Sequence, residues 1–302
     1  MSGYQHTLLG LISHTAIHAG SGESDHIIDQ PIQREAHTDW PCIYGSSMKG
    51  AFRSKARNTE GISSTVERLF GKDPDQHGAH DQAGELMISD ARLLLLPVRS
   101  LNTHYRWVTC PAILGRLKRD LQRLGDKVAN KLDADIPVDN ESAVVASELS
   151  EALYLEEYRL TIPESSQVTS EKLTAWVKII SKLVTERDQD ITNLLTIVSD
   201  DTFRHLCRAA TPVSTHVRLK TDTKTNDGGA LWTMESLPPD TLMYVMLSAA
   251  TSRSQGDKER SETEFQQTVT QLFKDPYVQV GGNETTGMGW LQVKTWQEQS
   301  DE

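Results

Sequence analysis

The segment YVQVGGNETTGMGWLQVKTW, residues 277–296, places an apolar stretch on each side of a run that contains four glycines. The alternation of apolar and polar residues predicts short strands at 277–280 and 289–296, joined by the loop 281–289. Before this pair, the patterns predict helices and strands in irregular order, with hairpins among them. That order is typical of an α+β fold and not of a doubly wound parallel sheet.

The elements expected upstream follow from apolar periodicity and from turn residues. A hairpin is predicted from strands at 213–220 and 230–235, because Asp227-Gly228-Gly229 has the chemistry of a tight turn. The other predicted elements are strands at 5–15, 85–98, 104–109, 152–162 and 242–249, and helices at 47–58, 64–70, 111–124, 170–186, 201–209 and 259–273.

Composition excludes several classes of protein. The chain has 302 residues, of which 37% are hydrophobic, and three cysteines that form no Cys-x-x-Cys pair. No stretch approaches the ~18 apolar residues of a membrane span, and the first residues lack the pattern of a secretory leader. We expect Cys42, Cys110 and Cys207 to be buried free thiols. The sequence therefore predicts a cytoplasmic protein, neither membrane-embedded nor stapled by disulfides.

The formal net charge of −11 is unevenly distributed along the chain. Residues 133–164 hold nine acids and one base, and residues 297–302 add three acids, so the rest of the chain is neutral overall. Within that remainder, 40–59 and 112–131 are basic. A polyanion can bind such local patches, because attraction is screened over ~8–10 Å. For 112–131 a solvated helix face is an equally good interpretation.

The glycine-rich loop 281–289 can bring its backbone N–H groups close to a ligand, because glycine tolerates positive φ. A P-loop is excluded because no Lys-Ser/Thr pair directly follows its last glycine, and a dinucleotide site because no helix and distal acid can follow. A loop that lies along a phosphate backbone is compatible with the sequence. A plain glycine-rich hairpin is the alternative.

The stretch GSSMKGAFR, residues 45–53, predicts the start of a helix with Ser46 or Ser47 as its N-cap. A helix N-terminus with unbonded N–H groups attracts anions, and phosphate is the natural candidate. Lys49 and Arg53 are four residues apart and so share a helix face. An ordinary surface helix remains the alternative.

The carboxylates of Asp25 and Asp29 lie in a predicted loop, near His18 and His26 in sequence. Loop carboxylates beside histidines can serve acid–base or metal chemistry. A polar surface loop is the alternative. A second candidate for metal binding, His77 and His80 with Asp81, falls in a stretch that favours a flexible loop. No Gly-x-Ser-x-Gly elbow occurs, so a serine hydrolase has no support.

Taken in order, these motifs resemble the repeated backbone subunit of the type III-B (Cmr) CRISPR effector complex, a member of the RAMP superfamily. The resemblance is weakest over 125–200. The motifs that carry it are HAGSG (18–22), IDQPIQRE (28–35), YGSSMKGAFR (44–53), DARL (90–93), VTCP (108–111), GALW (229–232) and GGNETTGMG (281–289).

The resemblance implies a modified ferredoxin-like (RRM-like) palm with inserted loops and helices and a β-hairpin thumb. The whole chain, 1–302, would form one RAMP-type domain. The acidic segment 133–164 would be an insertion and 213–236 the thumb. Several copies would line up along a guide RNA beside other Cmr-type subunits, and each would cut the paired target RNA once.

The resemblance also implies roles for individual residues. Asp29 matches the cleaving aspartate, while His18 and Glu235 match other positions near the cut. Mg²⁺ or Mn²⁺ would assist, held weakly by Asp29 when target RNA is present. The positions that would face RNA are Gly20, Ser21, Ser46, Ser47, Lys49, Arg53, Lys220, Lys224, Gly281, Gly282, Asn283, Thr285 and Thr286.

One carboxylate is compatible with this chemistry, because RNA carries its own nucleophile, the 2′-OH. Asp29 could accept the hydroxyl proton or hold a hydrated ion. Base pairing to the guide would supply sequence recognition. Two alternatives stay open: a structural RNA-binding subunit in which Asp29 is idle, and a stand-alone guide-processing ribonuclease.

Overall fold

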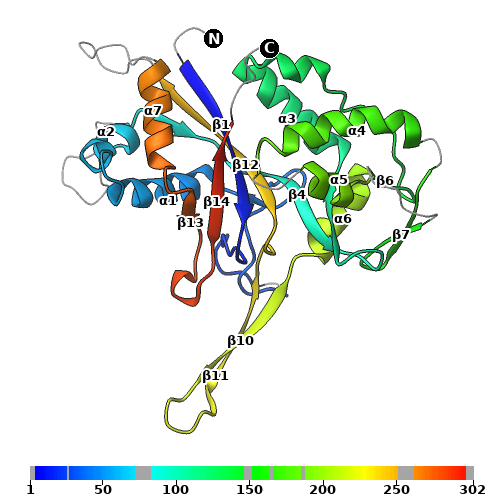
Figure 1. Cartoon of the computed structure of the whole chain (residues 1–302). Coiled ribbons are helices and arrows are strands. Elements are labelled where there is room, and N and C mark those ends of the chain that lie inside the picture. Colours follow the sequence, from blue (N-terminus) through cyan, green and yellow to red (C-terminus); the bar gives the residue numbers. More distant parts are fainter. Residues whose placement is uncertain are drawn as a thin grey trace.

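The computed structural model describes residues 4–25, 27–72, 83–145, 152–163, 166–184, 188–250 and 262–296. It has a body built on one large sheet and a two-stranded hairpin that projects from that body (Figure 1). His26, 73–82 and 297–302, on which some of the sequence expectations fall, lie outside the described residues.

The centre of the sheet is β1 (Tyr4–Ser13), which is buried on both faces from Thr7 to Ser13. It pairs antiparallel with β14 (Trp290–Thr295) on one side and β12 (Leu242–Ala250) on the other, and β12 pairs antiparallel with β4 (Ala91–Arg99). Four strands from the two ends and the middle of the chain thus lie side by side.

The sheet continues beyond these four strands at both edges and is mixed, because β5 and β9 run parallel. The order along its main path is β13-β14-β1-β12-β4-β5-β9-β6. The further strands are β2 (Cys42–Ile43), β3 (Leu86–Ile88), β5 (Tyr105–Thr109), β6 (Val144–Val145), β9 (Leu195–Ile197) and β13 (Tyr277–Gln279). This arrangement confirms the α+β class expected from the sequence.

Two groups of helices flank the sheet (Figure 1). One group is α1 (Gly45–Arg57), α2 (Val66–Phe70) and α7 (Glu262–Leu272). Within this group, Phe52 of α1 packs against Phe273, which follows α7, with ring centroids 5.1 Å apart. The other group is α3 (Pro111–Leu124), α4 (Ser166–Ile180), α5 (Asp188–Leu194) and α6 (Asp200–Ala209). Short 3₁₀ turns are η1 (Ser63–Thr65), η3 (Lys127–Lys131) and η4 (Glu284–Thr286).

The hairpin consists of β10 (Val213–Leu219) and β11 (Asn226–Glu235). The turn expected at 227–229 is wrong, because those residues lie inside β11. The chain reverses at 220–225 instead. There the N–H of Lys220 donates to the carbonyl of Thr225 at 2.9 Å, and Lys224 takes the left-handed conformation with φ 54°. The hairpin is therefore longer than predicted.

Three further expectations need correction. The strand expected at 85–98 breaks at Ser89 and Asp90 into β3 and β4. The strand expected at 152–162 is a small hairpin, β7 (Ala152–Leu155) and β8 (Tyr158–Thr161), with Glu156 at φ 47° in its turn. The helix α1 begins at Gly45 after Tyr44, so neither Ser46 nor Ser47 is its N-cap.

The acidic segment 133–164 is built into the body where the structure describes it. Val144 and Val145 pair with β9, and the indole N–H of Trp176 donates to the carbonyl of Asp133 at 2.8 Å. The three cysteines are buried, as expected. Among the described residues, no helix is both long and apolar enough to cross a membrane.

A glycine in β1 provides a test of this packing. A Cβ atom added at Gly10 would lie 1.9 Å from the carbonyl oxygen of Leu183, whereas one added at Gly50 in α1 would meet nothing within 4 Å. We expect Gly10→Ala to lower the free energy of unfolding by about 3 kcal/mol or more. Gly50→Ala should raise it by about 0.5–1 kcal/mol. Urea unfolding of both variants measures the difference, and equal stabilities would contradict the close approach.

Candidate functional site

The foot of the hairpin, Thr233-Met234-Glu235 at the end of β11, contacts most of the segments that the sequence marked as functional. Thr233 bonds to Asp29, Met234 meets Asn283, and Glu235 reaches His18 through its backbone and Arg34 through its side chain. Residues more than 200 positions apart in the chain are therefore brought into one site.

The carboxylate of Asp29 is exposed and is held on one side only. The backbone N–H of Thr233 donates to Oδ2 at 2.7 Å, and the Thr233 hydroxyl donates to the same oxygen at 2.9 Å. These two bonds hold the pKa of Asp29 below its ordinary value, and the bond from the Thr233 backbone has the larger effect. The group is therefore an anion at neutral pH. Within the described part of the chain, Oδ1 accepts no hydrogen bond.

The loop that carries Asp29 lies beside β11 like a short parallel strand. The N–H of Gln30 donates to the carbonyl of Thr233 at 3.0 Å, and the N–H of Glu235 donates to the carbonyl of Gln30 at 3.0 Å. Because these bonds fix the backbone immediately after Asp29, the position of the hairpin foot sets the position of the carboxylate.

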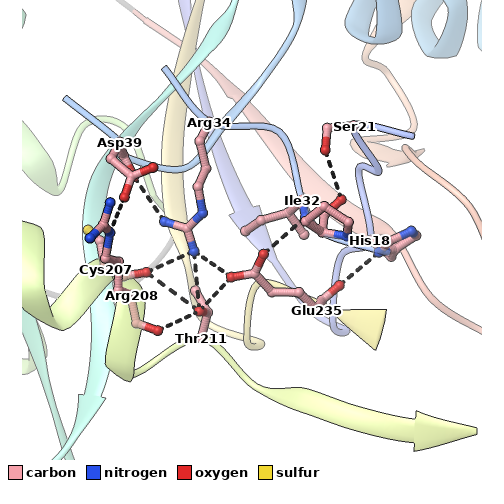
Figure 2. A network of polar contacts seen from close by, with 10 residues as sticks. His18, Ser21, Ile32, Arg34, Asp39, Cys207, Arg208, Thr211 and Glu235 are labelled. Atoms are coloured by element: carbon pink, nitrogen blue, oxygen red, sulfur yellow. Dashed lines mark hydrogen bonds and ion pairs between the residues drawn. The ribbon is translucent and has the colours of Figure 1, made fainter. Parts of the chain in front are cut away.

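Glu235 is 3% exposed, and both of its oxygens are bonded within the protein (Figure 2). Oε1 forms an ion pair with Arg34 and accepts a hydrogen bond from the Thr211 hydroxyl at 2.8 Å. Oε2 accepts the N–H of Ile32 at 3.0 Å. The same guanidinium donates to the carbonyl of Cys207 at 3.0 Å. Glu235 therefore joins the loop that carries Ile32 and Arg34 to Thr211, which follows α6.

His18 lies buried behind the Asp29 loop. Its Nδ1 is 2.7 Å from the carbonyl oxygen of Glu235, so Nδ1 carries the proton and Nε2 is the basic nitrogen. The ring is hemmed in by glycines. A Cβ atom at Gly20 would be 2.9 Å from Nε2, and one at Gly282 would be 3.6 Å from Cδ2.

Two glycines of the loop 281–289 are required by contacts inside the protein. Gly281 has φ 89°, and an added Cβ would lie 2.4 Å from the carbonyl oxygen of His18. Gly289 has φ 86°, and an added Cβ would lie 2.2 Å from that of Val280. A Cβ added at Gly287 would meet nothing within 4 Å. The exposed tip holds Asn283, Thr285 and Thr286.

Gln33 joins the start of α1 to the His18 segment. Its Oε1 accepts the N–H of Tyr44 at 2.6 Å, and its Nε2 donates to the carbonyl of Gly20 at 3.0 Å and to the Ser47 hydroxyl at 3.2 Å. The N–H of Gly45 donates to Asp90 at 2.7 Å. Gly20, Ser47 and the first turn of α1 are thus neighbours. Ser21 bonds to the carbonyl of Pro31 nearby.

The expected cations lie in different places. Arg53 donates to the carbonyls of Gly71 at 2.9 Å and Lys72 at 3.4 Å, so its guanidinium anchors α1 to the end of α2. Lys49 is half-buried on α1. Lys220 and Lys224 lie in the turn at the far end of the hairpin, so the structure does not bring them to Asp29.

A groove of about 720 Å³ runs between α1, β13 and the glycine-rich loop. Its lining includes Ser47, Lys55, Gly281 and Trp290. Two regions that the sequence assigned to RNA binding therefore share one surface. Across the described residues, no group of three His, Cys, Asp or Glu side chains is placed to hold a metal ion. Asp29 Oδ1 is one carboxylate oxygen of the Asp29 loop that could ligate an ion.

Sequence reasoning missed the functional importance of Gln33, Arg34 and Thr233. The first two are part of the polar triplet Gln33-Arg34-Glu35, whose third member accepts a bidentate ion pair from Arg116 at 2.7 and 2.8 Å. Three consecutive long polar side chains in a predicted loop could have indicated polar contacts with the body of the protein. In the structure, each of the three is bound by a different element. Thr233 carried no such signal.

Comparison with known proteins supports the motif resemblance. A model of the RAMP superfamily matches residues 11–292. The CRISPR system Cmr endoribonuclease Cmr4 of Pyrococcus furiosus is 34% identical over 290 residues, which are 95% of this chain and 94% of that protein.

Solved structures agree with this match. A crystal structure of oligomeric Cmr4 from Pyrococcus furiosus has a TM-score of 0.72 and 28% identity, and covers 98% of this chain and 99% of that one. A chain of the type III-B Cmr-beta complex bound to cognate target RNA has a TM-score of 0.74 at 21% identity, covers 96% of each chain, and so shares the fold. Because the superfamily model spans nearly the whole chain and a full-length relative is this similar, the chain belongs to the RAMP superfamily and, within it, to the Cmr4 family of type III-B CRISPR subunits.

Proposed function

We propose that this chain is a guide-RNA-binding backbone subunit of a type III-B CRISPR ribonucleoprotein and cuts complementary target RNA at regular intervals. The full-length relative named an endoribonuclease supports the activity. The observation that carries the proposal is the Asp29 carboxylate, anchored through Oδ2 and open to solvent at Oδ1 beside the projecting hairpin. The protein would work in the cytoplasm.

The strand order supports a ferredoxin-like palm within a single RAMP-type domain. Taken in chain order, β1, α1, β4, β12, α7 and β14 form a β-α-β-β-α-β unit, and its strands lie in the order β14-β1-β12-β4. The remaining strands and helices are then insertions, and the β10–β11 hairpin is the thumb. Wedged into a guide–target duplex, such a hairpin would expose one phosphodiester of the target to Asp29.

The chemistry needs a base and a constrained substrate. The 2′-OH of the target attacks the adjacent phosphorus as the bond to the 5′-oxygen breaks, which leaves a 2′,3′-cyclic phosphate on one product and a 5′-OH on the other. Asp29 accepts the hydroxyl proton through Oδ1, and water protonates the departing 5′-oxygen. Its lowered pKa keeps it an anion, ready to accept that proton. Alignment of the 2′-OH with the leaving oxygen supplies much of the rate. We assign His18 and Glu235 to positioning, because both are bonded within the protein.

One free carboxylate oxygen fits a weakly held, hydrated Mg²⁺ or Mn²⁺ and does not fit a closed metal cage. Such an ion, when bound, would stabilise negative charge on the phosphate.

Guide RNA would lie along the groove between α1 and the glycine-rich loop. Ser46, Ser47 and Lys49 would contribute from α1. Gly20 and Ser21 lie beside it, and Gly281, Gly282, Asn283, Thr285 and Thr286 come from the loop. Lys220 and Lys224 would meet RNA at the tip of the hairpin. Further copies of the chain, and other Cmr-type subunits, would extend this track. Arg53 would contribute by fixing α1, because its guanidinium is bonded to two carbonyls.

The catalytic role of Asp29 is tested in guide-loaded complex with end-labelled complementary RNA. We expect Asp29→Ala to abolish a regular ladder of products, with a loss of at least about 100-fold, while target binding is kept. EDTA should abolish the ladder in the wild type. Asp25→Ala, a second exposed acid of the same loop, should cut normally. An unchanged ladder in Asp29→Ala would leave the chain as a non-cutting RNA-binding subunit. A single metal-independent cut in a repeat would indicate a guide-processing ribonuclease.

The positioning role of Glu235 predicts a stability defect. Removing one partner of a buried ion pair leaves the other charge uncompensated, so Glu235→Gln should lower the free energy of unfolding by roughly 3 kcal/mol. Glu157→Gln, at an exposed position, should be neutral. Urea unfolding measures both. Wild-type stability in Glu235→Gln, combined with loss of cutting on bound target, would show instead that Glu235 acts on the RNA.

The role of α1 predicts an electrostatic contribution from Lys49. Lys49→Ala should weaken guide binding to a similar degree for different guide sequences, and should reduce the slope of log K against log salt by about 1. Lys178→Ala on α4, in the other group of helices, is the matched control (Figure 1). Filter binding at several salt concentrations gives both slopes. Identical slopes for Lys49→Ala and the wild type would exclude this contact.

A further inference from the structure

We propose that Thr233 is a positioning residue for cleavage, and that its hydroxyl holds the Asp29 carboxylate in the orientation in which Oδ1 faces the RNA. The proposal rests on the proposed role of Asp29 and extends it to the hairpin. It assigns to β11 a second task besides displacing bases: to carry the side chain that aims the reactive carboxylate.

The two residues form a closed pattern of hydrogen bonds. The Thr233 N–H and hydroxyl both donate to Oδ2 of Asp29, at 2.7 and 2.9 Å. In return, the N–H of Asp29 donates to the Thr233 hydroxyl oxygen at 3.0 Å. The hydroxyl has a second acceptor within reach, the carbonyl of Ile27, but at 3.4 Å that contact is the weaker one. The shorter contact assigns the proton to the carboxylate.

This pattern restricts the carboxylate in a way that one bond could not. Two donors on the same oxygen fix the direction of Oδ2, so the rotation that would exchange the two oxygens costs both bonds. Oδ1 is then the oxygen that remains for a proton or a hydrated ion. Charge-assisted bonds of this kind are stronger than neutral ones, which suits a group that is otherwise exposed to water.

The pattern also ties the carboxylate to the hairpin. Thr233 is the last residue of β11 before the buried pair Met234 and Glu235, and its cross-strand partner is Thr215 on β10. A displacement of the hairpin at this level therefore moves the donors of Asp29. Oδ1 of Asp29 would face the RNA only when the hairpin has the position seen in this structure. Insertion of the hairpin into a duplex is thereby coupled to the orientation of the Asp29 carboxylate.

The test compares three variants of the guide-loaded complex under single-turnover conditions with saturating target. Thr233→Val removes the hydroxyl and keeps the shape, Thr233→Ser keeps the hydroxyl, and Thr161→Val makes the same exchange at an exposed position of β8, away from the hairpin. We expect Thr233→Val to lower the cleavage rate at least tenfold with target affinity unchanged. Thr233→Ser should stay within threefold of the wild type, and Thr161→Val should equal it.

Rescue by serine and unchanged target affinity separate aiming from general damage. A variant that is only less well folded would lose target binding together with cleavage, and Thr233→Ser would not restore the rate.

The outcomes also separate this proposal from the one it rests on. If Asp29→Ala leaves the ladder intact, the catalytic role of Asp29 fails. If Asp29→Ala abolishes cutting while Thr233→Val cuts at the wild-type rate, only the positioning role fails. Equal losses in Thr233→Ser and Thr233→Val would also overturn it, because the serine keeps the hydroxyl.

Discussion

The carboxylate of Glu235 is almost fully buried, and an anion in that position must be compensated by donors that the fold brings to it. Here the three donors come from two segments of the chain. Arg34 and the N–H of Ile32 belong to the loop after His18, and the Thr211 hydroxyl follows α6. Any arrangement that separated these segments would leave the charge unpaired. The ion pair therefore fixes the long N-terminal loop, the end of α6 and the hairpin relative to one another.

The alternation of a strand turns this single anchor into a site. Thr233 and Glu235 are two residues apart, so they face the same side of β11, and both contact the loop 27–34. Met234 points the other way and meets Asn283 of the glycine-rich loop. A shift of register by one residue would exchange these faces, remove the donors from Asp29 and expose Glu235. Burial of the ion pair makes that shift costly and so protects the geometry at Asp29.

Local patterns in the sequence predicted what depends on local physics. The strands β1, β5, β12 and β14 and the helices α1, α3 and α6 follow from periodicity and appear within a few residues of their expected bounds. The turn of the hairpin was predicted wrongly, although Asp227-Gly228-Gly229 is a strong turn signal. These residues lie within β11, where its register with β10 shifts. Thr233 could not be found at all, because its role depends on a residue 204 positions away. The sequence predicted that Gly281 allows a close approach of the backbone, and the structure shows such an approach to the carbonyl oxygen of His18.

The hairpin combines a firmly held foot with an unsupported end. A two-stranded ribbon is marginally stable by itself in water, and Val217, Leu219 and Leu231 are each more than two-fifths exposed on it. Burial of these side chains would stabilise the folded ribbon. In the proposed complex, bound RNA or a neighbouring subunit would bury them. The foot differs, because it is tied to the body by the Glu235 ion pair and by the bonds between Gln30 and β11. Order gained at the far end is therefore transmitted along a paired strand to Thr233 and its neighbour Asp29. In such a design the chemistry can rest on one carboxylate, since the substrate brings its own nucleophile and the protein supplies direction.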